Sequence, residues 1–562
     1  MRALLVCLPL IAGCVSEPLM GMPEHREAAT ENARFKAVVE AYLAWYYANW
    51  PTQATADGVH DHDGRLPRLS RADLEGVLAA EQDWLNRLST IDRARLSPDH
   101  FYDALVLEAR IRASLLDLGA VRPWERDPGY YREPISSGLY TLATRSFATP
   151  ERRLALAAQR LRDVPSVLTA ARENLKTPAA IRTEIAIDEF TGLRSFIDKT
   201  LPAAFATVVQ PKEFVEAHKA ALAAVDAFID WLKKELAPRS TGSFAIGEAA
   251  YAAKLAHEEM VDTPVDELLA RGEALLRATQ EEFKRTASAI DGAKPAAQIL
   301  KETAKEHPPA DKLLDSVRAM MDDLKRWAHE RVCDVPADAA CAIQETPEFR
   351  RATSFASMEI PGPFETVAKE AYYSVTLPDP SWSAERQEQH LSFYNRYTLP
   401  IISVHEAYPG HYVQFLVSNT CPSKVRRVFG CGSFSEGWAH YLEQVYADSV
   451  GDPKLKLHQL HMALLRICRY IAGIKMHCRG MTVEQAIDLF RTEGYQEPEN
   501  ARREARRGTG DPTYLVYTLG KMEILRLRDE LALPEREFHN RFIAQGYPPI
   551  KVVRMILTGS RS

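Results

Sequence analysis

Three features are missing from the 562-residue sequence, and each absence excludes a class of protein. The 70 Lys and Arg residues do not outnumber the 76 Asp and Glu residues, so the net charge of −6 gives no basic excess for binding nucleic acid. No apolar run after the first residues is long enough to cross a bilayer. Beyond residue 33 we find no internal repeat and no linker rich in Pro, Gly or Ser, which predicts one large body.

The first 13 residues have the pattern of a lipoprotein signal peptide. An apolar run too short to span a membrane ends in Ile11-Ala12-Gly13-Cys14. Small residues before Cys14 allow cleavage there and acylation of the cysteine, although a plain signal peptide cut elsewhere stays open. We therefore expect residues 14–33 to be an acylated Cys and a flexible tether. The tether would anchor a body outside the cytoplasm to an inner or outer membrane surface.

Six cysteines would remain in that body: Cys333, Cys341, Cys421, Cys431, Cys468 and Cys478. An even number in an oxidising compartment predicts disulfides. The spacings suggest local loops over 333–341 and 421–431. Cys468 and Cys478 would lie about 15 Å apart on a straight helix, too far for a bond. The sequence has no C-x-x-C spacing, so a zinc–thiolate site is the weaker interpretation of these cysteines.

Residues 34–562 form the expected body, in an N-terminal helical half (34–324) and a second half (325–562). The apolar residues of 34–324 recur at helical spacing, as in Phe35, Val38, Val39 and Tyr42. One β-rich segment, Ala371–Leu377, precedes Pro378 and reads as a strand. The fold class predicted is mainly α, with a small β-element lining a cleft.

A candidate metal site begins at His405-Glu406-Ala407-Tyr408-Pro409-Gly410-His411. In the zinc motif H-E-x-x-H, two His on one helix face bind the ion and the Glu acts as general base. Here the His residues are six apart, so on a regular helix their rings would point about 120° apart. Pro409 and Gly410 can break the helix and re-aim His411. The alternative is a helix end with two ordinary His residues.

A third ligand is required, because catalytic zinc takes three protein ligands and leaves one position for water. The helix-compatible segment Phe434–Glu443 places Glu436, His440 and Glu443 on one face. Glu436 is the first choice of ligand and Glu443 the second, and His440 is a candidate for orienting a ligand. A buried carboxylate bonded to an Arg remains the structural alternative.

The two segments together resemble the DUF885 family of bacterial (lipo)proteins, predicted gluzincin-like zinc metallopeptidases. The resemblance rests on His-Glu-x-x-Pro-Gly-His and Glu-Gly-Trp-Ala-x-Tyr-x-Glu, and it extends from about residue 35 to the C-terminus. It implies a multi-helical gluzincin-like body with one Zn²⁺. The implied site consists of His405, His411 and Glu436 as ligands and Glu406 as base. The chain departs from the family pattern at Tyr412, Gly473, Lys475 and Thr513.

Further candidate residues lie on either side of the metal motifs. Tyr517, in a Tyr-x-x-Gly element that matches the family, is our candidate oxyanion donor, with Tyr514 as a local rival and a buried structural Tyr as the alternative. Arg528 could receive a substrate carboxylate or form a salt bridge. The strand with Tyr373 could be a sheet edge that binds substrate as an added strand, or part of a structural hairpin.

The function that we expect is hydrolysis of peptide bonds by metal-activated water, at the outer side of a membrane. One alternative is a lipid-anchored binding or scaffold protein without catalysis, which the departures at Gly473, Lys475 and Thr513 keep open. Another is a zinc hydrolase that acts on a non-peptide amide. The partners expected are a peptide and the membrane that holds Cys14, and no nucleic acid.

Overall fold

The structure is a computed structural model that describes residues 23–347, 351 and 354–561. The expected signal peptide 1–13 and Cys14 lie outside the described residues. Residues 23–33, which we expected to belong to a flexible tether, instead begin the first helix. No helix in the described part of the chain combines the length and apolarity needed to cross a bilayer.

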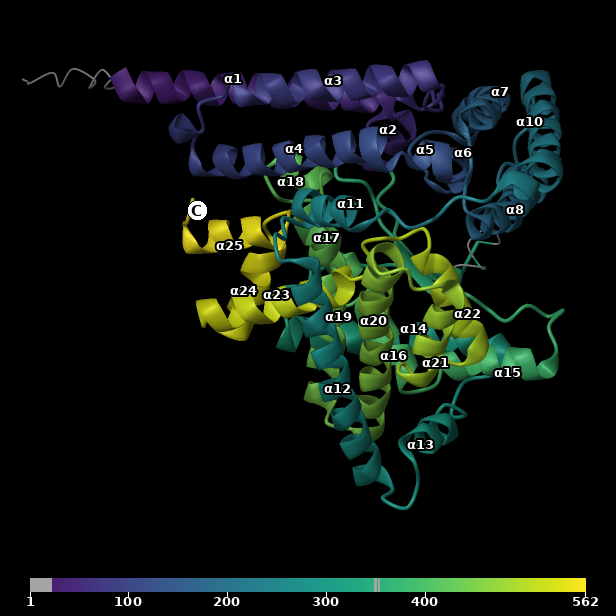
Figure 1. Ribbon diagram of the computed structural model, residues 1–562, viewed down its shortest axis with the longest axis vertical. Helices are drawn as coiled ribbons and strands as arrows, with labels where there is room; N and C mark the ends of the chain where they lie inside the picture. The colour runs from purple at the N-terminus through teal and green to yellow at the C-terminus, as the bar shows by residue number, and fades with distance from the viewer. Residues whose placement is uncertain (1–22, 348–350, 352–353, 562) are drawn as a thin grey trace, which may run out of the picture.

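The predicted fold class is confirmed, since helices make up most of the chain and the strands form one small sheet (Figure 1). Long helices α1, α3 and α4 form one end of the molecule, where Ser70 and Ser97 cap α3 and α4 through their side chains. These helices share a core with the C-terminal helix α25, and Tyr102 of α4 donates a hydrogen bond to the carbonyl of Met555. The helices of this end are α1 (Pro23–Asn49), α2 (Pro51–Asp57), α3 (Arg71–Ser89), α4 (Pro98–Leu116) and α25 (Ile550–Thr558).

A second helical group lies beside this end and has its own apolar core. It consists of α5 (Pro123–Arg126), α6 (Gly129–Thr144), α7 (Pro150–Asn174), α8 (Ala180–Ser195), α9 (Leu201–Ala203) and α10 (Lys212–Trp231). Short 3₁₀ or π segments join or extend helices at η1 (His60–His62), η2 (Arg93–Arg95), η3 (Asp117–Val121), η4 (Phe196–Thr200), η5 (Leu232–Leu236), η6 (Ala237–Arg239), η7 (Leu255–Glu259) and η8 (Ala310–Lys312).

The remaining helices form the body that carries the metal motifs. One core joins α11–α13 to α20–α22, so residues from both halves of the chain build it. These helices are α11 (Glu248–Lys254), α12 (Val265–Ile290), α13 (Ala296–Thr303), α14 (Leu313–Arg331), α15 (Ala384–Phe393), α16 (Thr398–Glu406), α17 (His411–Ser418), α18 (Lys424–Val428), α19 (Gly432–Val450), α20 (Pro453–Cys478), α21 (Val483–Thr492), α22 (Pro498–Gly508), α23 (Val516–Leu531) and α24 (Glu535–Ile543). A capping box of Thr482 and Gln485 starts α21.

The sheet corrects our expectation for the strand that contains Tyr373. Strand β3 (Tyr372–Val375) is the central strand, parallel to β1 (Ala342–Glu345) and antiparallel to β2 (Ala356–Glu359). The predicted substrate-binding edge is therefore wrong, because both sides of β3 are already paired. The Tyr373 side chain is buried and its hydroxyl lies 3.2 Å from Ser403 Oγ, so it supports helix α16.

The predicted disulfides are also wrong, since all six cysteines in the described part of the chain are free thiols. Cys468 and Cys478 lie within the unbroken helix α20, about 15 Å apart at helical rise. The Cys431 thiol instead donates a hydrogen bond to Glu259. Burial raises the pKa of Cys333 to about 12, which keeps this thiol protonated and unreactive towards exchange.

Helices α19 and α23 cross at two glycines, Gly437 and Gly520, and this crossing positions the site. A Cβ on Gly520 would lie 1.9 Å from the carbonyl oxygen of Ser433, and one on Gly437 would lie 2.5 Å from the backbone of Gly520. Only glycines allow this approach. It places Tyr517, one turn before Gly520, against Glu436, which precedes Gly437.

Gly520→Ala should therefore destabilise the protein by about 1–3 kcal/mol, because the added methyl group meets backbone that cannot move aside. Gly76→Ala is the matched control: Gly76 lies on α3 with nothing within 4 Å of an added Cβ, so the variant should gain up to about 1 kcal/mol. Urea unfolding followed by circular dichroism measures both. An unchanged midpoint for Gly520→Ala would contradict the close crossing.

Candidate metal centre

The two His residues of the motif come from different helices. Helix α16 ends at Glu406 and α17 begins at His411, so the helix breaks between them as the Pro-Gly pair predicts. The Gly410 N–H donates to the Val404 carbonyl at 2.9 Å, and a Cβ on Gly410 would lie 1.8 Å from the His405 carbonyl oxygen. The break places the two imidazole rings nearly perpendicular, with centroids 4.8 Å apart.

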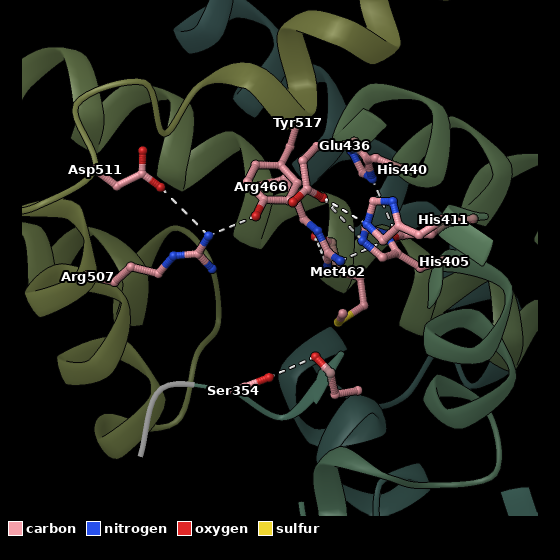
Figure 2. Close-up of polar contacts among 12 residues, drawn as sticks. Ser354, His405, His411, Glu436, His440, Met462, Arg466, Arg507, Asp511 and Tyr517 are labelled. Atoms are coloured by element: carbon pink, nitrogen blue, oxygen red, sulfur yellow. Dashed lines mark hydrogen bonds and ion pairs between the residues drawn. The ribbon is translucent and has the colours of Figure 1, made fainter. Parts of the chain in front are cut away.

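Glu436 on α19 completes a group of three metal-binding side chains (Figure 2). Its Oε2 lies 3.4 Å from Nε2 of His405 and 3.4 Å from Nε2 of His411. Tetrahedral ligands at about 2.0–2.1 Å from zinc are separated from one another by about 3.3–3.4 Å. Glu436 Oε2 is also buried without a hydrogen-bond partner among the described residues. The three residues therefore fit a Zn²⁺ ion.

Glu443 holds His405 in the orientation that such a site needs. Its Oε1 lies 2.8 Å from Nδ1 of His405 and accepts from Arg466 at 2.8 Å, while its Oε2 lies 3.0 Å from Nδ1 of His440. With Nδ1–H donated to a carboxylate, Nε2 of His405 keeps its lone pair for a metal. Glu443 is thus an orienting residue rather than the third ligand, and His440 positions Glu443.

The charges of this cluster are strongly coupled. Although burial alone would raise it, contacts with His405 and His411 hold the pKa of Glu436 well below its usual range. Burial would lower the pKa of His405, but Glu436 and Glu443 outweigh it and raise the pKa to about 9. Burial and Lys521 lower the pKa of His440 to about 3. Ionised carboxylates thus surround a point that favours positive charge.

Two side chains beside the three ligands have free polar groups. Glu406 makes no hydrogen bond or ion pair with any residue that the structure describes, so its carboxylate is available as a base. Arg507 donates to the Tyr517 hydroxyl at 2.9 Å, and burial together with Glu436 raises the pKa of Tyr517 to about 12. The phenol therefore keeps its proton and can donate it to a substrate oxygen.

The structure places two other predicted residues away from the ligands. Tyr514 donates its hydroxyl proton to Glu504, which is also bound by Arg469, so it does not compete with Tyr517. Arg528 pairs with Asp529 and lines a separate surface depression. The pair with Asp529 fits the salt-bridge alternative, while a substrate-binding role for Arg528, whose side chain is partly buried, stays a prediction.

Two arginines at the site, Arg466 and Arg507, were not predicted from the sequence. A signal for Arg466 was present: it interrupts the apolar run Leu464-Leu465-Arg466-Ile467 on α20, and a buried Arg requires an anionic partner. Arg507 carries no such signal, because it belongs to the highly charged helix α22, and only the tertiary packing brings it to Tyr517.

A cavity of about 1350 Å³ lies beside these groups, and none of the three candidate ligands, Glu406 or Tyr517 is part of its wall. Its wall includes Arg507, which contacts Tyr517, and Met462, whose carbonyl accepts from Arg466. Figure 2 shows Arg507 and Asp511 on one side of the cluster and Ser354, another wall residue, below it. The ends of β2 and β3 and helices α15 and α22 border the cavity, and the side chain of Arg507 connects its wall to Tyr517.

The family model described as "Bacterial protein of unknown function (DUF885)" matches residues 51–557. The chain belongs to the DUF885 family. This match includes all three candidate ligands, Glu406 and Tyr517. No curated protein matches the chain.

Two solved structures share the fold of this DUF885 protein. One is described as a "putative lipoprotein of unknown function" from Shewanella oneidensis; it is 26% identical, with a TM-score of 0.75, and the match covers 93% of this chain and 99% of that one. The other, a "putative lipoprotein" from Colwellia psychrerythraea, is 15% identical, with a TM-score of 0.77, and the match covers 95% and 99% of the two chains.

Glu443→Gln should weaken zinc binding about 10- to 100-fold, because His405 loses the carboxylate that orients it. Competition with a chromogenic chelator measures the affinity. Glu504→Gln is the matched control, since Glu504 is another buried carboxylate paired with an Arg but touches no ligand. Equal zinc affinity of the wild type and Glu443→Gln would contradict the orienting role.

Glu504 also predicts a dependence of stability on pH. Although burial raises it, Arg469 lowers the pKa of Glu504 from an ordinary 4.5 to about 2. Its contribution, on the order of 3 kcal/mol, is then present above about pH 4.5 and is lost as the pH falls towards 2. The difference in unfolding free energy between the wild type and Glu504→Gln should shrink over this range. Urea titrations at pH 6, 4 and 3 measure it, and a constant difference would contradict the shift.

Proposed function

We propose that this protein is a zinc-dependent peptidase. The observation that carries the proposal is the spacing of 3.4 Å from Glu436 Oε2 to Nε2 of both His405 and His411, which suits tetrahedral zinc. Two His and one Glu are a ligand set typical of catalytic zinc that keeps a position open for water. When bound, the ion supplies a Lewis acid that activates water and polarises a carbonyl.

The residues of the chain provide the proton transfers and charge stabilisation of amide hydrolysis. Glu406, whose carboxylate is unpaired among the described residues, takes a proton from the attacking water and passes it to the leaving amine. Tyr517 donates to the carbonyl oxygen as negative charge develops there, because Arg507 occupies its lone pair and leaves its proton free. Glu443 and His440 keep His405 in place throughout.

A binding or scaffold protein without catalysis is less well supported. Two of the three departures that raised this alternative, Gly473 and Lys475, contact residues other than the ligands. Gly473 packs against Tyr514, where an added Cβ would lie 3.0 Å from that residue's Cβ, and Lys475 pairs with Glu273 at 2.7 Å. Neither change removes a ligand, the base or Tyr517.

The proposed location is outside the cytoplasm, with the chain anchored to a membrane through acylated Cys14. The sequence pattern around Cys14 supports this location, and so do the two structural relatives described as lipoproteins. The proposed partners are a peptide substrate and a membrane surface. Hydrolysis of a non-peptide amide would use the same residues, and only substrate tests separate the two.

Glu406→Gln should retain stoichiometric zinc but lose turnover, since the amide side chain cannot accept the proton. Zinc content by elemental analysis and cleavage of a mass-spectrometric peptide library measure the two properties. Activity in Glu406→Gln would reject its role as base. A wild-type protein that binds zinc but cleaves no peptide would reject the peptidase.

Tyr517→Phe should lower kcat about 100- to 1000-fold, the loss typical of one oxyanion donor. The control is Tyr514→Phe, because its hydroxyl binds Glu504 and should leave kcat nearly unaffected. Steady-state kinetics on one cleaved peptide compares them. A larger loss for Tyr514→Phe would reverse the assignment.

A further inference from the structure

Helix α22 presents a polar stripe to the cavity. Asn500, Arg503 and Arg507 are spaced i, i+3 and i+7, so they follow one face of the helix, and all three line the cavity. The wall as a whole carries more Lys and Arg than Asp and Glu. The stripe therefore offers hydrogen-bond donors and positive charge to whatever enters from the cavity side.

Arg503 has no anionic partner in the described part of the chain. Its Nη1 is buried without a hydrogen-bond partner, and no carboxylate among the described residues forms an ion pair with it. Its guanidinium stacks over the Phe355 ring at 4.2 Å, which fixes its plane but leaves its N–H groups free. Burial lowers the pKa of Arg503, and Tyr394 and the carboxylates of Glu504 and Glu499, none of which is bonded to it, offset this only in part.

The neighbouring Arg506, unlike Arg503, has anionic partners. It lines the same cavity, but its guanidinium is bound by Glu184 and by Asp188. Asn500 resembles Arg503, because its Oδ1 is buried without a partner among the described residues while its amide nitrogen donates to Gln496. One acceptor and one charged donor thus stand unsatisfied, one turn apart, in the wall of the same cavity.

The distance along α22 from Arg503 to Arg507, which contacts Tyr517, limits how far a group bound at Arg503 can lie from the proposed reaction centre. Arg507 contacts the Tyr517 hydroxyl, and Arg503 lies one turn earlier, about 6 Å along the helix axis. An extended peptide advances about 3.3–3.6 Å per residue. A group bound at Arg503 would therefore lie one or two residues from a carbonyl held at Tyr517.

We propose that Arg503 binds a carboxylate of the substrate, one or two residues from the bond that is cleaved, and that Asn500 accepts an N–H of the same residue. This inference rests on the proposed function and gives its substrate class: peptides that carry a carboxylate close to the scissile bond. The carboxylate comes either from the free C-terminus or from an acidic side chain. A guanidinium binds either one through two parallel hydrogen bonds.

The test compares three forms of one short peptide that the zinc-loaded enzyme cleaves: the free acid, the C-terminal amide, and an amide with Asp at the terminal position. The wild type should cleave a carboxylate-bearing form with a kcat/KM about 10- to 100-fold above that of the plain amide, mainly through KM. Preference for the free acid identifies the C-terminus as the source, and equal preference for the Asp amide identifies the side chain. Equal rates for all three forms would overturn the inference.

Arg503→Gln should abolish the preference, so that acid and amide forms are cleaved with equal kcat/KM, and Arg503→Lys should restore part of it. Arg506→Gln is the matched control: it removes a guanidinium from the same wall, but one that is already paired, and should keep the preference. Loss of the preference in Arg506→Gln to the same extent would show a general charge effect and overturn the assignment to Arg503.

Binding separates this inference from the proposed function. Zinc-loaded Glu406→Gln, titrated with the fluorescent free acid and amide, should bind the acid about 10- to 100-fold more tightly, and the added substitution Arg503→Gln should remove the difference. Preferential binding of the acid without cleavage of any peptide by the wild type would overturn the peptidase and keep the carboxylate site. Cleavage of peptides by the wild type with equal binding of acid and amide would keep the peptidase and overturn the carboxylate site.

Discussion

The close contact between Gly410 and the carbonyls of Val404 and His405 is the constraint on which the rest of the site depends. Two His residues six apart on a continuous helix would diverge by about 120°. The break between α16 and α17 brings their Nε2 atoms to the same carboxylate oxygen instead. No residue larger than glycine fits at position 410, because its Cβ would overlap a backbone oxygen that is fixed by the helix itself.

A second close contact, this one between two glycines, positions the carboxylate that the two His residues need as a partner. The crossing of α19 and α23 at Gly437 and Gly520 places Glu436 and Tyr517 together, so the ligand and the candidate oxyanion donor are positioned by one interface. The apolar core around Trp438 holds α19 against α16 and α24. The geometry of the site thus depends on backbone contacts that have little freedom to relax, as the fixed spacing of metal ligands requires.

The local features of this arrangement could be predicted from the sequence, but most of its tertiary contacts could not. The break between His405 and His411 could be predicted from the Pro-Gly pair, and Glu436 could be chosen as their partner from the second motif; the structure brings the three side chains together. The position of β3 could not, since it depends on pairing with Ala342–Glu345, 30 residues earlier in the chain. Arg507 and Arg503 look like any solvated charges on a helix until α22 is packed against the cavity. The even number of cysteines did not predict disulfides correctly: all six in the described residues are free, and most of them are buried.

Two groups of charges, one beside the cavity and one in its wall, complement each other. At the end beside the cavity, the carboxylates of Glu436 and Glu443 face the imidazoles, and Arg466 is the one guanidinium described there that binds either carboxylate. That end favours a cation. At the other end, Arg503 lies on an aromatic ring without a counter-ion among the described residues. A peptide that presents a carbonyl oxygen to the first end and a carboxylate to the second would satisfy both. A neutral ligand of the same length would leave the guanidinium unpaired, which is why charge rather than side-chain shape should dominate substrate choice here.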